Sequence, residues 1–264
     1  MKIQVLVATM NQTDHSLLKK LNIQTDALVG NQCSQNSIYS FEWKEHQITY
    51  YNFNEKGVGL NRNNTLMRAN CDVCLFADDD MVYLDGYEKI VVKAFSDYPK
   101  ADVIVFNLIE NHSSGIKRYV IKKPTKVNYF NFLRYGAVRI AAKFKPLKEN
   151  AIYYNECFGG GCEYRHGEDN LFLAECLKKG LKVIAIPVDL AELTEERVST
   201  WNVGYDDKYF YDQGKFYSIL SRRWWKLLCL QDAIRHRKIF KRKWTESYKL
   251  MKKWQKNEKN INCL

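Results

Sequence analysis

The stretch LFADDDMVY, residues 75–83, decides the fold and raises the first question about function. An apolar run leads directly into three aspartates, Asp78, Asp79 and Asp80. In open α/β sheets, ligands bind beyond the carboxyl ends of the strands, so these acids lie where a site belongs. Neighbouring carboxylates repel one another unless a cation lies among them, and their hard oxygens suit Mg²⁺ or Mn²⁺. The stretch therefore predicts a buried strand that ends at a divalent-cation site. The alternative is that the aspartates only cap a turn or the next helix.

Strand-like and helix-like segments alternate on both sides of this stretch. Short β-branched runs predict strands, and amphipathic stretches that end near glycine or proline predict helices. The alternation predicts an α/β fold with a mixed, mostly parallel sheet flanked by helices. The predicted strands are 2–9, 26–32, 46–53, 71–77, 101–109, 136–144 and 181–187, and the predicted helices are 14–22, 60–69, 87–98 and 168–179.

Length and composition fit a globular chain. The 264 residues are 46% hydrophobic, which suffices for a sizeable core. The first residues lack the apolar segment of a signal peptide, and no run of eighteen apolar residues predicts a membrane span. The eight cysteines are scattered, so we interpret them as reduced thiols. These features predict a cytoplasmic protein.

The positive charge belongs to the last fifty residues. The net charge is +11, but residues 215–264 hold 15 Lys and Arg against 3 Asp and Glu, which leaves about −1 for the rest. We therefore predict a main domain over 1–214 and a basic, aromatic helical extension over 215–264. A basic helix with tryptophans and leucines suits the interface of an anionic membrane. A helix packed on its own domain with a solvated basic face is an equal alternative.

The sequence resembles the family 2 glycosyltransferases, whose nucleotide-sugar-binding domain has the Rossmann-related GT-A fold. Three blocks carry the resemblance: VLVATMN (5–11), KGVGLNRNNTLMRANCDVCLFADDDM (56–81) and IYYNECFGGGCEYRHGEDNLFLAECLKKGLKVIAIP (152–187). The middle block is the most specific, because a glycine loop, an Arg-Asn pair, a strand and the acidic cluster follow in the family's order. With its connecting segments the resemblance covers roughly residues 1 to 212.

The resemblance implies a donor site at the aspartates. Asp78 and Asp80 match the outer positions of the family's Asp-x-Asp motif, so Asp80, with Asp78, would bind Mn²⁺ or Mg²⁺, and Asp79 is counted with the donor-binding residues. Thr9, Asn11 and Arg62 match positions that line the nucleotide pocket. Many members hold the base with an acidic Asp-Gly-Ser after the second strand, whereas this chain has VGNQCSQN, so Asn31 and Gln32 would supply neutral hydrogen bonds instead. Uridine is the expected base.

The same resemblance places the acceptor at Glu168 and Asp169, in HGEDNLF. It implies an inverting displacement in which Asp169 takes the proton of the acceptor hydroxyl. A place in the first turn of a helix would stabilise the anion and weaken its basicity. The alternative is an ordinary acidic helix N-terminus. A further metal ligand stays unassigned among Asp189, Glu192, Glu195 and Glu196.

The resemblance thus implies a nucleotide-sugar-dependent hexosyltransferase, with a glycan or lipid-linked saccharide as acceptor, in assembly of an envelope or capsular polysaccharide. A lipid-carried acceptor would explain peripheral attachment to the inner face of the cell membrane. One alternative is a haloacid-dehalogenase-like phosphohydrolase with Asp78 as nucleophile, although that motif usually begins its fold. Another is a non-enzymatic nucleic-acid binder that uses the basic tail, which leaves both acidic clusters unexplained. We expect no nucleic-acid partner.

Overall fold

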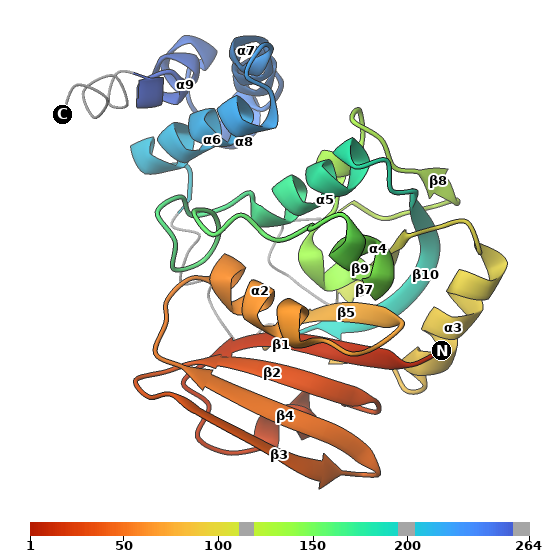
Figure 1. Cartoon of the computed structure of the whole chain (residues 1–264). Coiled ribbons are helices and arrows are strands. Elements are labelled where there is room, and N and C mark those ends of the chain that lie inside the picture. The colour runs from red at the N-terminus through yellow and green to blue at the C-terminus, as the bar shows by residue number, and fades with distance from the viewer. Residues whose placement is uncertain (111–118, 195–203, 256–264) are drawn as a thin grey trace. The chain divides into compact units, whose positions relative to one another are not determined.

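The computed structural model describes residues 1–110, 119–194 and 204–255 (Figure 1). The chain divides into two compact units. The first holds residues 1–156 and 168–198, and the second holds residues 157–167 and 199–264. The second unit is therefore built from two separate stretches of the sequence.

A mixed sheet of ten strands organises the first unit (Figure 1). The strand order is β3-β4-β2-β1-β5-β9-β7-β10-β6, and β8 pairs with β10. Neighbours in β4-β2-β1-β5 are parallel, as are β7 and β10, whereas the other pairs are antiparallel. The strands are β1 (Ile3–Met10), β2 (Asp26–Gln32), β3 (Ser37–Trp43), β4 (His46–Phe53), β5 (Val73–Asp78), β6 (Met81–Tyr83), β7 (Val103–Glu110), β8 (Thr125–Lys126), β9 (Ile140–Lys143) and β10 (Val183–Leu193).

The sheet's helices follow the predicted alternation. Helix α2 packs on β1 and β2, and α3 contacts β10 (Figure 1). The helices are α1 (Ser16–Lys20), α2 (Val58–Arg68), α3 (Tyr87–Asp97), α4 (Phe144–Glu149) and α5 (Glu168–Lys178), with 3₁₀ turns η1 (Phe132–Arg134) and η2 (Ala137–Arg139). The predicted α/β fold with a mixed sheet is confirmed.

The register of the central strands brings polar ends together. Strand β1 lies between β2 and β5, with Thr9 opposite Asn31 and Ala8 opposite Asp78. These strands are almost wholly buried up to that point, since each lies between two other strands of the sheet and α2 packs on β1 and β2. The first exposed positions of three strands therefore meet at one edge, as a binding site requires.

Three strands, β3, β6 and β8, escape prediction. Strand β3 pairs with β4 at the edge of the sheet, where its side chains are exposed or half-buried. Its alternating Tyr39, Phe41 and Trp43 are a strand signal that was available in the sequence. Strand β6 has three residues and forms directly after the Asp79–Asp80 turn, by pairing with the end of β10. Strands β6 and β8, of three and two residues, depend on pairing with β10 more than on their own composition.

The second unit is a helical cluster. Its helices are α6 (Asp207–Leu220), α7 (Trp225–Arg235), α8 (Arg237–Phe240) and α9 (Trp244–Met251). Gly214 of α6 lies so close to the Met251 carbonyl that any side chain there would overlap it. Residues 157–167 join through Arg165, which donates to Asp206 at 2.8 Å. The predicted division at 214/215 falls inside α6. The two compact units described above divide the chain at other positions. Within the described ranges, no helix is both long and apolar enough to cross a bilayer.

Candidate active site

The three aspartates lie at the carboxyl edge of the sheet, as predicted. Asp78 is the last residue of β5, and Asp79 and Asp80 form the turn into β6. The Asp80 carbonyl accepts a hydrogen bond of 2.9 Å from the Thr194 backbone N–H, which follows β10. The acidic turn is thereby fixed to two separate strands.

Thr9 and Asp79 are directly bonded across the edge. Thr9 Oγ1 donates to Asp79 Oδ2 at 2.7 Å, and the Gln12 amide donates to Thr9 Oγ1 at 2.9 Å. Asp79, the middle aspartate, therefore holds the acidic turn against β1.

Asn31 and Gln32, the neutral side chains predicted to contact the nucleotide base, form hydrogen bonds within the protein. Asn31 is buried, donates to the Gln12 carbonyl (2.9 Å) and Asn52 Oδ1 (2.8 Å), and accepts from the Gln12 N–H (2.9 Å). Gln32 Oε1 accepts from the Gly57 N–H at 2.7 Å, tying β2 to the start of α2. Asn11 has a positive φ of 54°, which asparagine tolerates, and its N–H donates to the Gln32 carbonyl. Contact of Asn31 with the nucleotide base stays a prediction. Because both N–H donors of its amide already bond within the protein, they are not available to the base.

Arg62 joins the two predicted halves of the site. It lies in α2, is buried, and donates to Asp78 Oδ1 at 2.6 Å and to Asp169 Oδ1 at 2.8 Å. Glu168 Oε1 is 3.6 Å from the same guanidinium, which lies over the ring of Tyr154 with its carbon 5.1 Å from the centroid. Burial alone would lower the pKa of Arg62, but the surrounding carboxylates raise it well above its usual range. A permanent cation therefore lies between the two acidic groups.

One guanidinium faces three carboxyl groups, and two of them, Glu168 and Asp169, have raised pKa values. Burial, then the charge of Asp169, raises the pKa of Glu168 to about 8. Burial also raises the pKa of Asp169, although Arg62 opposes the shift. At neutral pH the pair therefore holds a proton that free carboxyl groups would have lost.

Asp169 is fixed at both oxygens. Besides accepting from Arg62, it accepts from the Ala137 N–H at 2.9 Å through Oδ2. Each carboxylate oxygen has two lone pairs, so a further donor can still be accepted. The predicted weakening of Asp169 as a base by its place at a helix N-terminus is wrong in sign, because burial raises its pKa overall. The predicted base is more basic than a free aspartate.

The acidic turn fits a divalent cation only in part. Its oxygens are the hard ligands that Mg²⁺ and Mn²⁺ prefer, but no group of three metal-binding side chains gathers within the described ranges. Asp189 and Glu192 lie in β10, while Glu195 and Glu196 fall outside those ranges. Such a site suits an ion that takes most of its ligands from phosphates and water.

Several residues of this edge were not singled out from the sequence. Asn63 clamps the 154–156 segment, donating to the Tyr154 carbonyl (3.0 Å) and accepting from its N–H (2.8 Å). Gln12 and Asn52 complete the network around Asn31 and Thr9. Asn52 follows the alternating apolar pattern of β4 near its carboxyl end, and that position was the available signal.

The comparison with protein families defines the class of this chain. Residues 31–162, half of the sequence, match the family model described as Glycosyl transferase family 2. The chain therefore belongs to glycosyl transferase family 2 and is a glycosyltransferase of that nucleotide-sugar-dependent family. No curated protein matches the sequence significantly.

Solved structures of S. aureus TarS are similar to it. TarS 1-349 in complex with UDP-GlcNAc has a TM-score of 0.64 at 15% identity, covering 97% of this chain and 92% of that one. The complex with UDP has a TM-score of 0.62 at 15% identity and the same coverage. A longer TarS structure has a TM-score of 0.61 at 19% identity; 90% of this chain is covered, but the chain spans only 44% of that structure. This likeness confirms the GT-A-like fold and, at such low identity, nothing finer.

Proposed function

We propose that this chain is an inverting, metal-dependent glycosyltransferase that moves a sugar from a UDP-sugar to a glycan or lipid-linked saccharide in polysaccharide biosynthesis. The observation that carries the proposal is the bridge through Arg62. One buried guanidinium contacts Asp78 at 2.6 Å and Asp169 at 2.8 Å. The donor-side and acceptor-side carboxylates of the family pattern thus share one cation, within reach of a single bound substrate pair.

The donor side is the edge around the acidic turn. Thr9, Asn11 and Arg62 are proposed to line the nucleotide pocket with Asp78 and Asp79. The solved complexes of TarS with UDP-GlcNAc and UDP support a uridine nucleotide, since the folds are alike.

The acceptor side is the N-terminus of α5. The acceptor oxygen attacks the anomeric carbon, its O–H proton passes to the Asp169 carboxylate, and the bond from that carbon to the diphosphate oxygen breaks. The electron pair leaves with the nucleoside diphosphate. The raised pKa of Asp169, which burial and the charge of Asp78 produce against the opposing effect of Arg62, favours the proton transfer. Glu168 is proposed to complete the acceptor side, 3.6 Å from the same guanidinium.

A divalent cation is proposed at Asp80, with Asp78 facing the same region. When bound, the ion would neutralise charge on the leaving diphosphate. Besides lining the donor pocket, Asp79 positions the turn through its hydrogen bond with Thr9.

The segment 119–139 is proposed to receive the acceptor. It is bonded to the start of α5 through Ala137, and the Asn170 amide donates to the Tyr135 carbonyl at 3.0 Å. It carries five Lys or Arg and no acid, and the Phe130 side chain is 97% exposed. An acceptor with both apolar and anionic parts, such as a lipid-linked saccharide phosphate, suits this surface. Such an acceptor favours attachment to an anionic membrane.

The two alternatives lose support. Family membership and a GT-A-like fold weigh against a haloacid-dehalogenase-like phosphohydrolase, and pairing with Arg62 leaves Asp78 poorly suited as a free nucleophile. A purely nucleic-acid-binding role gives no reason for carboxyl groups gathered on a buried arginine.

A donor panel tests the proposal. UDP-sugars and other nucleotide sugars are offered with Mn²⁺, Mg²⁺ or EDTA, and donor hydrolysis and binding are measured. We expect cation-dependent binding of a UDP-sugar and slow release of UDP. Binding of no nucleotide sugar under any of these conditions would reject the proposal.

A further inference from the structure

Helix α7 has two apolar sides. Trp225, Cys229 and Ala233 are buried within the second unit. Leu227 and Ile234, seven residues apart and so on one side of the helix, are 56% and 41% exposed. Trp224, three residues before Leu227 and on the same side, is 52% exposed. Helix α7 therefore presents a second apolar stripe to solvent.

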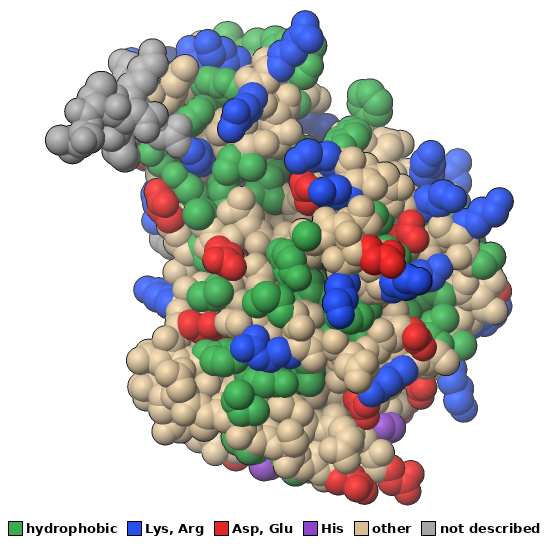
Figure 2. All heavy atoms as spheres, in the orientation of Figure 1, with side chains coloured by type: hydrophobic (Ala, Val, Ile, Leu, Met, Phe, Trp, Pro, Cys, Tyr) green, Lys and Arg blue, Asp and Glu red, His purple; other side chains and the backbone are tan. Residues whose placement is uncertain are grey.

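This stripe has basic borders. At 100° per residue, Arg235 lies beside one edge of the stripe. Arg223, in the turn before the helix, lies over the Trp224 ring with its guanidinium carbon 5.1 Å from the centroid. Residues 221–245 hold nine Lys and Arg against one acid, Asp232, which is buried and bonded to His236 at 2.6 Å. Figure 2 shows blue and green side chains adjoining over α7–α9. An exposed apolar stripe between basic flanks is the pattern of an interfacial helix.

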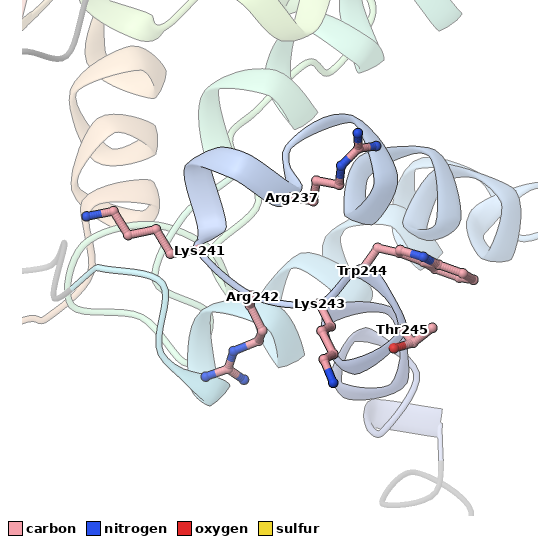
Figure 3. Close-up of a pocket in the computed structure, with 6 residues that line it drawn as sticks. All are labelled: Arg237, Lys241, Arg242, Lys243, Trp244 and Thr245. Atoms are coloured by element: carbon pink, nitrogen blue, oxygen red, sulfur yellow. The ribbon is translucent and has the colours of Figure 1, made fainter.

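A shallow basic pocket, called the hollow below, is lined by residues of α8, of the segment that follows it and of the start of α9 (Figure 3). It has a volume of about 590 Å³ and no acidic lining; its residues are Arg237, Lys241, Arg242, Lys243, Trp244 and Thr245. Arg242 is paired with Asp207 at 2.7 Å, whereas the other three cations form no ion pair within the described ranges. Figure 3 shows the basic side chains leaving the backbone in different directions. They offer separate charges to an extended surface and do not converge on one small anion.

We infer that the α7 stripe and this hollow form one docking surface for an anionic bilayer. Trp224, Leu227 and Ile234 enter the interface, and the cations of the hollow contact headgroup phosphates. A second copy of the chain is disfavoured, because it would bring like charges together. A nucleic acid would be attracted by the charge but would gain nothing from exposed leucine and isoleucine. The inference deepens the proposed function, since it rests on an acceptor carried at a membrane.

Vesicle co-sedimentation of the full chain tests this surface. Phosphatidylcholine vesicles with and without 30 mol% phosphatidylglycerol are compared at low and high salt. The variants are Leu227→Gln with Ile234→Gln, and Arg223→Glu with Arg235→Glu. The matched control is Lys89→Glu with Lys100→Glu, which makes the same charge change in the first unit.

We expect binding only to anionic vesicles, weakened by salt. Binding to vesicles should fall at least about tenfold in both α7 variants and only modestly in the control. For the arginine variant this follows from a loss on the order of fivefold per basic side chain removed. Equal binding to neutral vesicles, equal losses in the control, or binding to RNA or to a second copy with no binding to vesicles would overturn the inference. Donor hydrolysis without vesicles is measured in parallel and should be unchanged in the α7 variants. A docking failure with intact hydrolysis would therefore leave the proposed function standing.

Discussion

Replacing Arg62 with glutamine should destabilise the protein in a pH-dependent way. Removing one partner of a buried ion pair costs about 3–5 kcal/mol. The Asp78 and Asp169 side chains are 35% and 26% exposed, so solvent offsets part of this cost. We expect a loss of about 2–3 kcal/mol at pH 8.

The pH dependence follows from the carboxyl groups that Arg62→Gln leaves unpaired. Without the cation, the already raised pKa values of Glu168 and Asp169, which Arg62 otherwise lowers, rise further in the folded state, so the folded variant binds more protons than the unfolded chain. Stability then falls as pH rises. At pH 5.5 protonation relieves the repulsion, and the loss should shrink to about 1 kcal/mol.

Urea unfolding followed by circular dichroism at pH 5.5 and 8.0 measures both values. Arg139→Gln is the matched control, because Arg139 is equally buried but donates to the Tyr119 carbonyl, and its ion pair with Glu110 measures 4.0 Å. Its loss should depend less on pH. An Arg62→Gln loss that is the same at both pH values would refute the electrostatic account of the site.

Three further predictions concern individual carboxyl groups. Asp169→Asn should retain donor binding and lose transfer by about 10²–10⁴-fold, whereas Glu175→Gln, further along the same helix, should transfer normally in the same single-turnover assay. Asp80→Ala should abolish the difference in donor affinity between Mn²⁺ and EDTA; calorimetry that still finds the full difference would remove Asp80 as a metal ligand. Glu168 keeps its proton to about pH 8 when folded, so wild-type stability should decline between about pH 5 and 8. Glu168→Gln should flatten that decline in urea titrations, and an unchanged slope would contradict the raised pKa.

Much of the fold could be predicted because its strands carry their own signals. Strand β4 coincides with the predicted 46–53, and α5 differs from its prediction by one residue. Strand β10 extends beyond the predicted 181–187, because its later residues pair with β6 and β7 through register shifts near Asp189. Pairing between distant segments has no local sequence signature.

The sequence predicted where the residues of the candidate site lie in the fold, but not which of them form hydrogen bonds with one another. The strand ends placed Thr9 and Asp78 at one edge, and Arg62 was singled out only by resemblance. That Arg62 would contact Asp169, 107 residues away, depends on how α2 and α5 pack. The sign of the Asp169 shift was missed for the same reason, since burial outweighs a helix terminus and cannot be read from an acidic pair in a sequence.

The split composition of the second unit has a consequence for synthesis and truncation. Residues 157–167 leave the ribosome about 40 residues before α6 begins, a delay of roughly 2 to 8 seconds at ordinary elongation rates. During that time Phe158 and Tyr164, stacked at 4.7 Å in the finished protein, lack the helices of their unit. A chain cut after residue 203 would keep this exposure permanently and should aggregate. Isolating the first unit therefore calls for shortening 157–167 as well as removing the helices.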